Sequence, residues 1–257
     1  MQISFENGRE VTTVKGDSMF ENVIGLKQKY RNGERIIGVS MAPNTPPDRF
    51  DQIMDKDDYD FVSIDSQHTP LSEERIAAFC DMAAERDVFV QFRIKHTRNA
   101  YLIGNYLDLG PCGIEIPQTE LEETVDDALH YFYYPPAGGR SFGGRHRRGT
   151  EDKTTEEYAD WWNSFGILWL QIESVEAATR GHLLAKAGVD CLSMGPTDLS
   201  MSIKAHPQHW LKSVDDTIAY LCRSLEGTGV AVCHRNGTPD TREKYADMGV
   251  TVFLESA

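Results

Sequence analysis

The sequence lacks long hydrophobic runs: no stretch of about 18 consecutive apolar residues occurs in its 257 residues. A membrane-spanning helix needs a run of that length, so we expect no membrane span. Residues 1–15 are polar and contain no apolar core of a signal peptide, which favours a cytoplasmic protein.

Basic residues are also scarce, since Lys and Arg number 26 against 40 Asp and Glu, giving a formal net charge of −14. Such a charge repels nucleic acid and anionic membranes, so we expect neither as a partner. The five cysteines are scattered and include no Cys-x-x-Cys pair. This pattern favours reduced thiols over a disulfide framework or a zinc site.

What the sequence does contain is an alternation of short apolar runs and amphipathic stretches along most of its length. The apolar runs predict eight strands, at residues 35–41, 61–65, 88–94, 113–117, 167–172, 191–194, 230–233 and 250–254. The stretches between them predict helices, at residues 47–54, 72–86, 99–109, 120–132, 175–186, 210–225 and 240–248.

This α/β order predicts a parallel sheet, and eight repeats in about 250 residues predict a closed (β/α)8 TIM barrel. We expect one barrel domain over residues 1–257. A doubly wound open sheet is the main alternative, although no Gly-x-Gly-x-x-Gly motif follows the first strand.

Three segments depart from the alternation. Residues 1–23 form an N-terminal extension, and residues 16–32 predict an extra helix that covers the bottom of the barrel. Residues 134–150 form a loop rich in Gly and Arg that could clamp an anionic substrate, form an interface or lie in solvent. The eighth outer helix is missing after the last predicted strand, which leaves a gap for the N-terminal segment or a partner subunit.

Acidic residues end two successive predicted strands: Glu173 follows residues 167–172, and Asp198 follows residues 189–194. In a parallel barrel both would point into the mouth at the C-terminal ends of the strands, where active sites lie. Two carboxylates with water suit a hard divalent cation. Alternatively, Glu173 could cap the next helix and Asp198 the turn after Pro196. We interpret the matching pair as a metal site.

Other polar side chains lie at the ends of neighbouring strands and helices. His68 could be a general base, because histidine titrates near neutrality, or could simply bond a backbone carbonyl. Arg93 lies among apolar residues, so its guanidinium needs an anionic partner, either Asp65 or a bound carboxylate or enolate. Asp108 opposes the dipole at the end of a predicted helix, which indicates a specific partner such as a histidine.

The turn Gly195-Pro196-Thr197-Asp198 offers free backbone N–H groups. These groups could cradle a substrate carboxylate, or the segment could be no more than a tight turn between strand and helix.

Together these segments resemble the HpcH/HpaI aldolase family, the metal-dependent class II pyruvate aldolases that are also similar to citrate lyase β subunits. The matching segments occur in the family's order, at residues 59–68, 93, 107–110, 134–140, 171–173 and 188–200. The resemblance covers residues 24–254. It implies a (β/α)8 barrel that cleaves 4-hydroxy-2-oxo acids to pyruvate and an aldehyde.

The resemblance also implies a metal and substrate site. Glu173 and Asp198 would hold a divalent cation, which the sequence does not assign as Mg²⁺, Mn²⁺ or Co²⁺. Arg93 and Gln171 would contact the pyruvate part, and the turn from Gly195 to Asp198 would receive its carboxylate. This agrees with the chemistry, because a cation and a guanidinium both stabilise the enolate formed when the C3–C4 bond breaks.

For proton transfer, the resemblance implies His68 paired with Asp108, with Asp65 close by. A small 2-oxo acid is the expected partner, and the family's hexamers imply a homo-oligomer. The sequence departs from the family at Ser66-Gln67, where Gly-Glu is usual and one acidic charge is lost. His96 and the pair His234-Arg235 are additions with no assigned role.

These departures leave two alternatives to the aldolase. Gln67 and His234 motivate a metal-dependent decarboxylase, or an enzyme that forms a carbon–carbon bond from an oxaloacetate or pyruvate enolate. The missing last helix and the lost acidic residue together leave room for a non-catalytic barrel that binds a 2-oxo acid.

Overall fold

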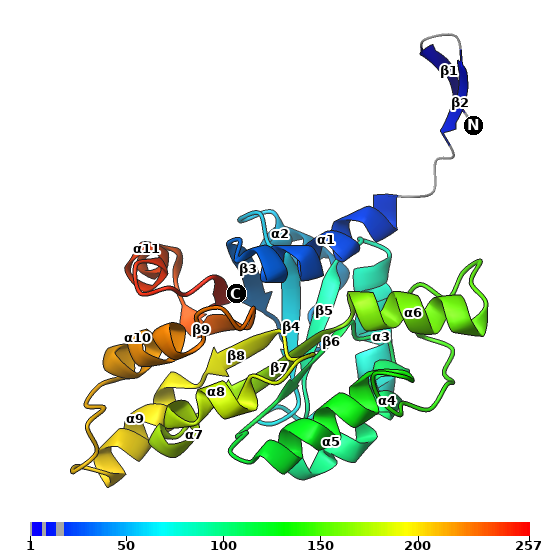
Figure 1. The fold of residues 1–257 in the computed structure, drawn as a ribbon. Helices are drawn as coiled ribbons and strands as arrows, with labels where there is room; N and C mark the ends of the chain where they lie inside the picture. Colours follow the sequence, from blue (N-terminus) through cyan, green and yellow to red (C-terminus); the bar gives the residue numbers. More distant parts are fainter. Residues whose placement is uncertain (1, 7–8, 14–17) are drawn as a thin grey trace.

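The computed structural model describes residues 2–6, 9–13 and 18–257, and its main body is a closed barrel of eight parallel strands (Figure 1). The strands follow one another around the barrel in the order β10-β3-β4-β5-β6-β7-β8-β9. The predicted TIM barrel is therefore confirmed, and the open sheet is excluded. The strands are β3 (Ile36–Ser40), β4 (Phe61–Asp65), β5 (Phe89–Arg93), β6 (Gly113–Ile116), β7 (Ile167–Ile172), β8 (Cys191–Met194), β9 (Ala231–Gly237) and β10 (Val252–Ser256).

Helices connect these strands and surround the barrel. They are α1 (Ser18–Asn32), α2 (Pro47–Met54), α3 (Glu73–Ala84), α4 (Ile103–Leu107), α5 (Glu122–Phe132), α6 (Thr155–Phe165), α7 (Val175–Thr179), α8 (Gly181–Leu184), α9 (Pro196–Ala205), α10 (Val214–Ser224) and α11 (Arg242–Ala246). Two 3-10 helices, η1 (Thr97–Leu102) and η2 (Pro239–Thr241), precede α4 and α11. An antiparallel pair, β1 (Gln2–Glu6) and β2 (Arg9–Thr13), lies near the N-terminus.

Several predicted helices differ in detail. The helix expected over residues 99–109 consists of η1 and α4, and the one over 175–186 is divided into α7 and α8. The helix expected from residue 210 begins at Val214, because the Ser213 hydroxyl accepts the backbone N–H of Asp216 and caps it there.

Two helices were not predicted. A capping box starts α6, in which Thr154 and Glu157 bond each other's backbone N–H groups. The other is α9, which turns the expected loop at Gly195 into the beginning of a helix, with Pro196 in its first turn.

The extra N-terminal helix is present as α1, although Gly16 and Asp17 lie outside the described residues. The Tyr30 hydroxyl accepts a hydrogen bond of 3.1 Å from Trp169 Nε1 inside the barrel. Lys27 Nζ lies 3.2 Å from the carboxylate of Asp190, just before β8. Because these contacts lie at the N-terminal ends of the strands, α1 covers the bottom of the barrel as expected.

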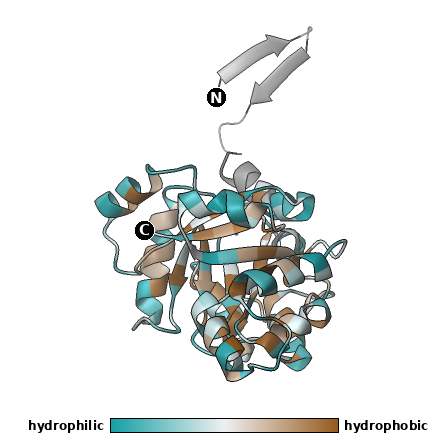
Figure 2. Cartoon of the chain, turned by 90° about the vertical axis from the view of Figure 1, so that its left-hand side faces the viewer, coloured by the Kyte–Doolittle hydropathy of each residue, from teal (hydrophilic) through white to brown (hydrophobic). Residues whose placement is uncertain are grey.

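The barrel wall is apolar, but the interior near the C-terminal ends of the strands is polar. In Figure 2 the hydrophobic residues concentrate on the strands and on the inward faces of the helices. Buried polar and charged side chains instead occupy positions near the C-terminal ends of the strands. They include Arg93, Glu115, Gln171, Glu173 and Arg235. Burying charge is costly unless it is paired, so this concentration indicates a site.

The long loop at residues 134–150 packs against the outer layer of helices. The Arg140 guanidinium lies over the rings of Tyr134 and Trp162, at 4.8 and 4.6 Å from their centroids. Arg148 donates to backbone carbonyls of Cys80 and Val88. This packing holds two of the loop's arginines, Arg140 and Arg148, against the outer layer of the barrel.

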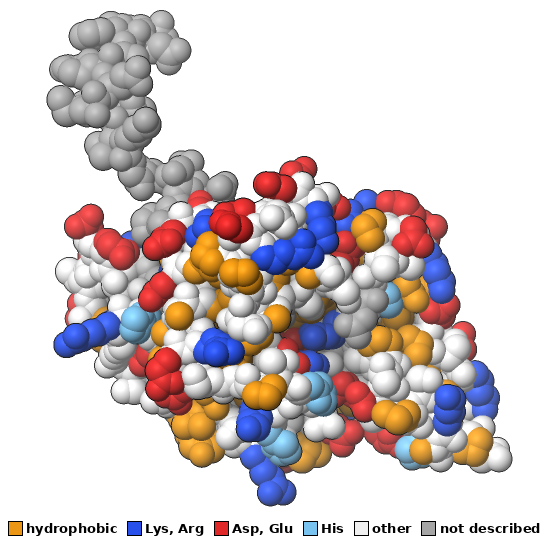
Figure 3. Space-filling view, turned by 180° about the vertical axis from the view of Figure 1, so that it is seen from behind, with side chains coloured by type: hydrophobic (Ala, Val, Ile, Leu, Met, Phe, Trp, Pro, Cys, Tyr) orange, Lys and Arg blue, Asp and Glu red, His pale blue; other side chains and the backbone are white. Residues whose placement is uncertain are grey.

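Figure 3 shows acidic and basic side chains interspersed over one face of the molecule, without one extended basic patch. No helix in the described part of the chain is both long and apolar enough to cross a membrane. All five cysteines are free, as the scattered spacing predicted.

Candidate active site

A cavity of about 310 Å³ opens at the C-terminal ends of the strands. It is lined by His68, Arg93, Gln171, Glu173, Gly195, Pro196, Thr197, Asp198 and Arg235. The barrel thus brings together most of the site residues expected from the sequence. The volume is at the small end of the range for ligand pockets, roughly 300–1,000 Å³, which favours a small ligand.

Glu173 lies directly after β7 and is 8% exposed. It does not cap α7, because the hydroxyl of Ser174 accepts the backbone N–H of Ala177 instead. Its Oε2 atom is buried and has no hydrogen-bond partner among the described residues. Burial and the charge of Asp198, opposed by Arg93, raise the pKa of Glu173 to about 7. The site therefore holds two neighbouring acids whose negative charges oppose each other.

A divalent cation would fit this pair. No cluster of three or more His, Cys, Asp or Glu suited to a metal occurs in the described part of the chain. The ligands from the protein would therefore be the two carboxylates of Glu173 and Asp198, with water completing the shell. That arrangement suits Mg²⁺, which binds through one or two carboxylates and retains several waters.

Gly195 lets the backbone approach these acids closely. A Cβ atom at this position would lie 2.5 Å from Glu173 Oε1 and 3.0 Å from Gln171 Nε2. Beyond it α9 begins, so the backbone N–H groups of Thr197 and Asp198 belong to the first turn of a ten-residue helix. Such groups have no partner within a helix and can receive an anion, as the turn hypothesis required.

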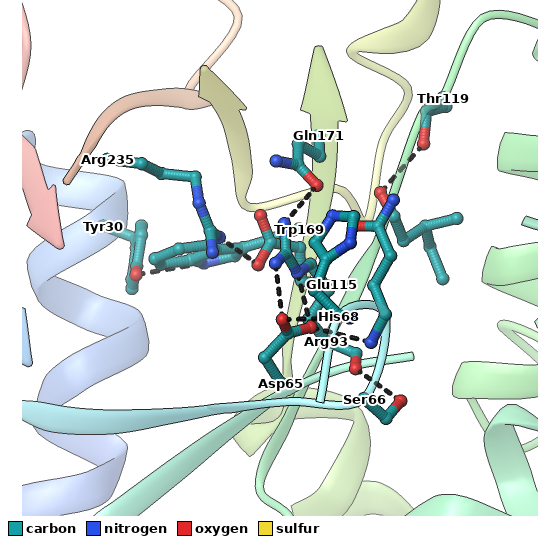
Figure 4. A network of polar contacts seen from close by, with 12 residues as sticks. Tyr30, Asp65, Ser66, His68, Arg93, Glu115, Thr119, Trp169, Gln171 and Arg235 are labelled. Atoms are coloured by element: carbon teal, nitrogen blue, oxygen red, sulfur yellow. Dashed lines mark hydrogen bonds and ion pairs between the residues drawn. The ribbon is translucent and has the colours of Figure 1, made fainter. Parts of the chain in front are cut away.

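Arg93 is held in place by two side chains (Figure 4). Its Nε and Nη2 donate to the two carboxylate oxygens of Asp65 at 2.8 and 2.7 Å, and its Nη1 donates to Gln171 Oε1 at 3.0 Å. Burial opposes ionisation of Asp65, but the hydrogen bonds and charge of Arg93 hold its pKa below the usual value. Asp65 is therefore the structural partner of Arg93, which still lines the cavity.

His68 is exposed and lines the same cavity. Its ring makes no hydrogen bond to any described residue, whereas its backbone N–H donates to Asp65 at 3.3 Å. Asp65 thus fixes both Arg93 and the segment that carries His68. The expected proximity of Asp65 to His68 is present.

Asp108 does not meet His68 within the chain. Its carboxylate accepts a bond of 2.8 Å from Arg140 Nη2, and it does not line the cavity. The prediction that Asp108 needs a specific partner is correct, but the partner is an arginine from the loop at 134–150. Burial raises the pKa of Asp108, opposed by Arg140.

Two residues of the site had no assigned role in the sequence analysis. Arg235 of β9 lines the cavity and donates through Nη1 to Glu115 of β6, which is fully buried. The sequence did carry a signal for this pair: Glu115 is a charged residue inside the apolar run Ile114-Glu115-Ile116, and a buried charge needs a partner.

The two added histidines lie outside the cavity lining. His234 stacks on the ring of Tyr245, with a centroid distance of 3.7 Å. His96 caps η1 by accepting the backbone N–H of Arg98 at 3.0 Å. Both therefore have local structural contacts.

Comparison with known proteins adds independent findings. Residues 49–232 match the family model described as HpcH/HpaI aldolase/citrate lyase. The chain is 26% identical over 240 residues to 2-keto-3-deoxy-L-rhamnonate aldolase of Escherichia coli, covering 90% of this chain and 88% of that protein. It is 30% identical over 183 residues to pyruvate aldolase of Rhizobium etli, covering 71% and 70%. A solved HpcH/HpaI aldolase from Desulfitobacterium hafniense shares the fold, with a TM-score of 0.79, 22% identity and 90% of each chain covered.

Proposed function

The chain belongs to the HpcH/HpaI aldolase/citrate lyase family and is a carbon–carbon lyase, and from this premise we propose that it cleaves a 4-hydroxy-2-oxo acid to pyruvate and an aldehyde with a divalent cation. The proposal goes beyond the family in naming the substrate class, the cation and the residues that act.

The observation that carries this proposal is the pair Glu173 and Asp198, with a buried unpartnered oxygen on Glu173, beside the guanidinium of Arg93. The charges around the cavity agree with it. Four carboxylates stand against two guanidinium groups, which leaves an excess of two negative charges when all are ionised: Asp65, Glu115, Glu173 and Asp198 against Arg93 and Arg235. A divalent cation would balance that excess.

Each side chain then has a task in the cleavage. When bound, a divalent cation held by Glu173 and Asp198 would act as a Lewis acid toward the 2-oxo group. Arg93 donates to the oxygen on which negative charge develops, because it is fixed by Asp65 and already desolvated. The N–H groups of Thr197 and Asp198 at the start of α9 receive the substrate carboxylate.

His68 is the proposed base. It accepts the proton of the C4 hydroxyl, the C3–C4 bond breaks, and its electron pair moves into the enolate while the aldehyde leaves. A proton then returns to C3, which completes pyruvate. Within this chain the carboxylate of Asp108 accepts a hydrogen bond from Arg140 rather than from His68, so these steps are written with His68 alone.

A chelation experiment tests the proposal. With 4-hydroxy-2-oxopentanoate as substrate, we expect equal release of pyruvate and acetaldehyde. Removing divalent ions with EDTA should lower the rate at least about 100-fold, and Mg²⁺ or Mn²⁺ should restore it. Unchanged activity after chelation would contradict the proposal. Release of CO₂ from oxaloacetate, without any aldehyde product from a 4-hydroxy-2-oxo acid, would favour the decarboxylase alternative.

A further inference from the structure

The cavity contains a second guanidinium that the proposed cleavage does not use. Arg235 reaches into it from β9, and its side chain is 7% exposed. One of its nitrogens, Nη1, donates to Glu115. Its other N–H groups make no hydrogen bond to any described side chain, and Arg235 lines the cavity, which leaves these donors available to a ligand there.

Arg235 and Arg93 are built in the same way. Each guanidinium is held by a carboxylate from another strand, Glu115 for Arg235 and Asp65 for Arg93. In Figure 4 Arg235 reaches Glu115, while the dashed lines from the Arg93 guanidinium lead to Asp65 and Gln171. Pairing with a carboxylate therefore does not remove a guanidinium from the cavity wall, since five N–H donors are available and Glu115 takes only part of them.

Packing alone does not require this pair. Removing two charges from water is costly, and apolar side chains of similar size commonly stabilise an interior as well or better. Glu115 is fully buried whereas Arg235 lines the cavity, so their hydrogen bond holds the guanidinium in place at the cavity wall. An oriented, desolvated guanidinium is well suited to bind a carboxylate through two parallel hydrogen bonds.

The pyruvate half of the substrate already has its anion site at Arg93 and the start of α9. We therefore propose, resting on the function proposed above, that Arg235 is a specificity-determining residue that binds an acidic group on the aldehyde half. The small cavity favours a short acid, so the substrate would be a 4-hydroxy-2-oxo acid with a second carboxylate close to C4.

The test runs the aldol reaction forward with pyruvate, Mn²⁺ and one of two aldehydes of similar size. Glyoxylate carries a carboxylate, and glycolaldehyde carries a neutral hydroxymethyl group. For the unmodified chain we expect kcat/KM for glyoxylate to exceed that for glycolaldehyde at least about 100-fold, because a site built for a polar group rejects an analogue that lacks it.

Arg235→Met should lower this ratio at least about 10-fold, mainly through a higher KM for glyoxylate. The double variant Arg235→Met/Glu115→Gln should lower it equally while avoiding an unpaired buried carboxylate. Arg242→Met is a matched control, because Arg242 is also ion-paired, with Asp57 and Glu255, but does not line the cavity. It should leave the ratio unchanged.

The ratio of the two kcat/KM values distinguishes a loss of specificity from a general loss of activity. If Arg235 had a purely structural role, its replacement would lower kcat/KM for both aldehydes alike. An unchanged ratio in the Arg235 variants, or no preference in the unmodified chain, would overturn the inference and leave the aldolase proposal standing. No product with either aldehyde would overturn the aldolase proposal and this inference with it.

Discussion

Glu173→Gln is expected to lower retro-aldol activity at least about 1,000-fold and, in the absence of metal, to make the protein more stable at pH 8. The first effect follows from the loss of one of two proposed cation ligands. The second follows from the pKa of Glu173, which is about 7 in the fold against an ordinary value of 4.5. Glutamine has nearly the same shape but carries no charge to bury.

The sign of the pH dependence can be worked out from that shift. Between pH 4.5 and 7 the folded chain retains a proton on Glu173 that the unfolded chain has lost, so stability falls as pH rises through this range. Above pH 7 Glu173 is ionised in the folded state as well, and the free energy of unfolding is then lower by roughly 3 kcal/mol than it would be without the pKa shift. The stabilisation by Glu173→Gln should therefore be fully present at pH 8 and vanish near pH 4.5.

Thermal melts in EDTA at several pH values measure this effect. At pH 8 we expect the variant to melt roughly 5–10 °C higher. Glu226→Gln serves as a matched control, because Glu226 is exposed, and its melting temperature should change little. A Glu173→Gln variant that keeps its activity, or that is less stable than the unmodified chain at pH 8, would contradict the proposed role.

Arg93→Met is the second change with a large expected effect. It should lower kcat at least about 1,000-fold, because the proposed donor to the developing oxyanion is lost. It should also destabilise the fold by roughly 3–5 kcal/mol, because Asp65 loses both of its side-chain bonds in a partly buried position.

The double variant Arg93→Met/Asp65→Asn separates the two effects. Removing the unpaired charge should recover part of the stability, as measured by chemical denaturation, while activity stays as low as in the single variant. Recovery of activity together with stability would show that Arg93 serves only the fold.

The sequence predicted the barrel because strands and helices have different periods that can be counted. β4, β7 and β8 have the predicted bounds, whereas β9 runs further, to Gly237, and β10 begins and ends later than predicted, at Val252–Ser256. Helix interruptions were less predictable. The break between α7 and α8 lies at Arg180, directly before Gly181, and the predicted helix ran through that glycine. A Cβ atom at Gly181 would overlap Leu221 Cδ1, so the glycine lets α8 pack closely on α10, a contact that the local sequence does not reveal.

The gathering of Arg93, Gln171, Glu173 and Asp198 was predictable because the C-terminal ends of all eight strands meet at one mouth. The ion pairs that cross the barrel interior could not be predicted from the sequence. Glu115 and Arg235 are 120 residues apart, and their contact depends on how the closed barrel sets its register. Asp108 accepts a hydrogen bond from Arg140 rather than from His68, and this partner was not predictable because Arg140 lies in a loop without regular structure.

The account depends most on the claim that Glu173 and Asp198 hold one divalent cation. A crystal grown with Mn²⁺ and oxalate, measured near the manganese absorption edge, tests this claim directly. We expect one anomalous peak in the cavity, about 2.0–2.3 Å from a carboxylate oxygen of each residue, with oxalate bound beside Arg93. A peak elsewhere, or a cavity in which oxalate binds while neither carboxylate touches an ion, would contradict it.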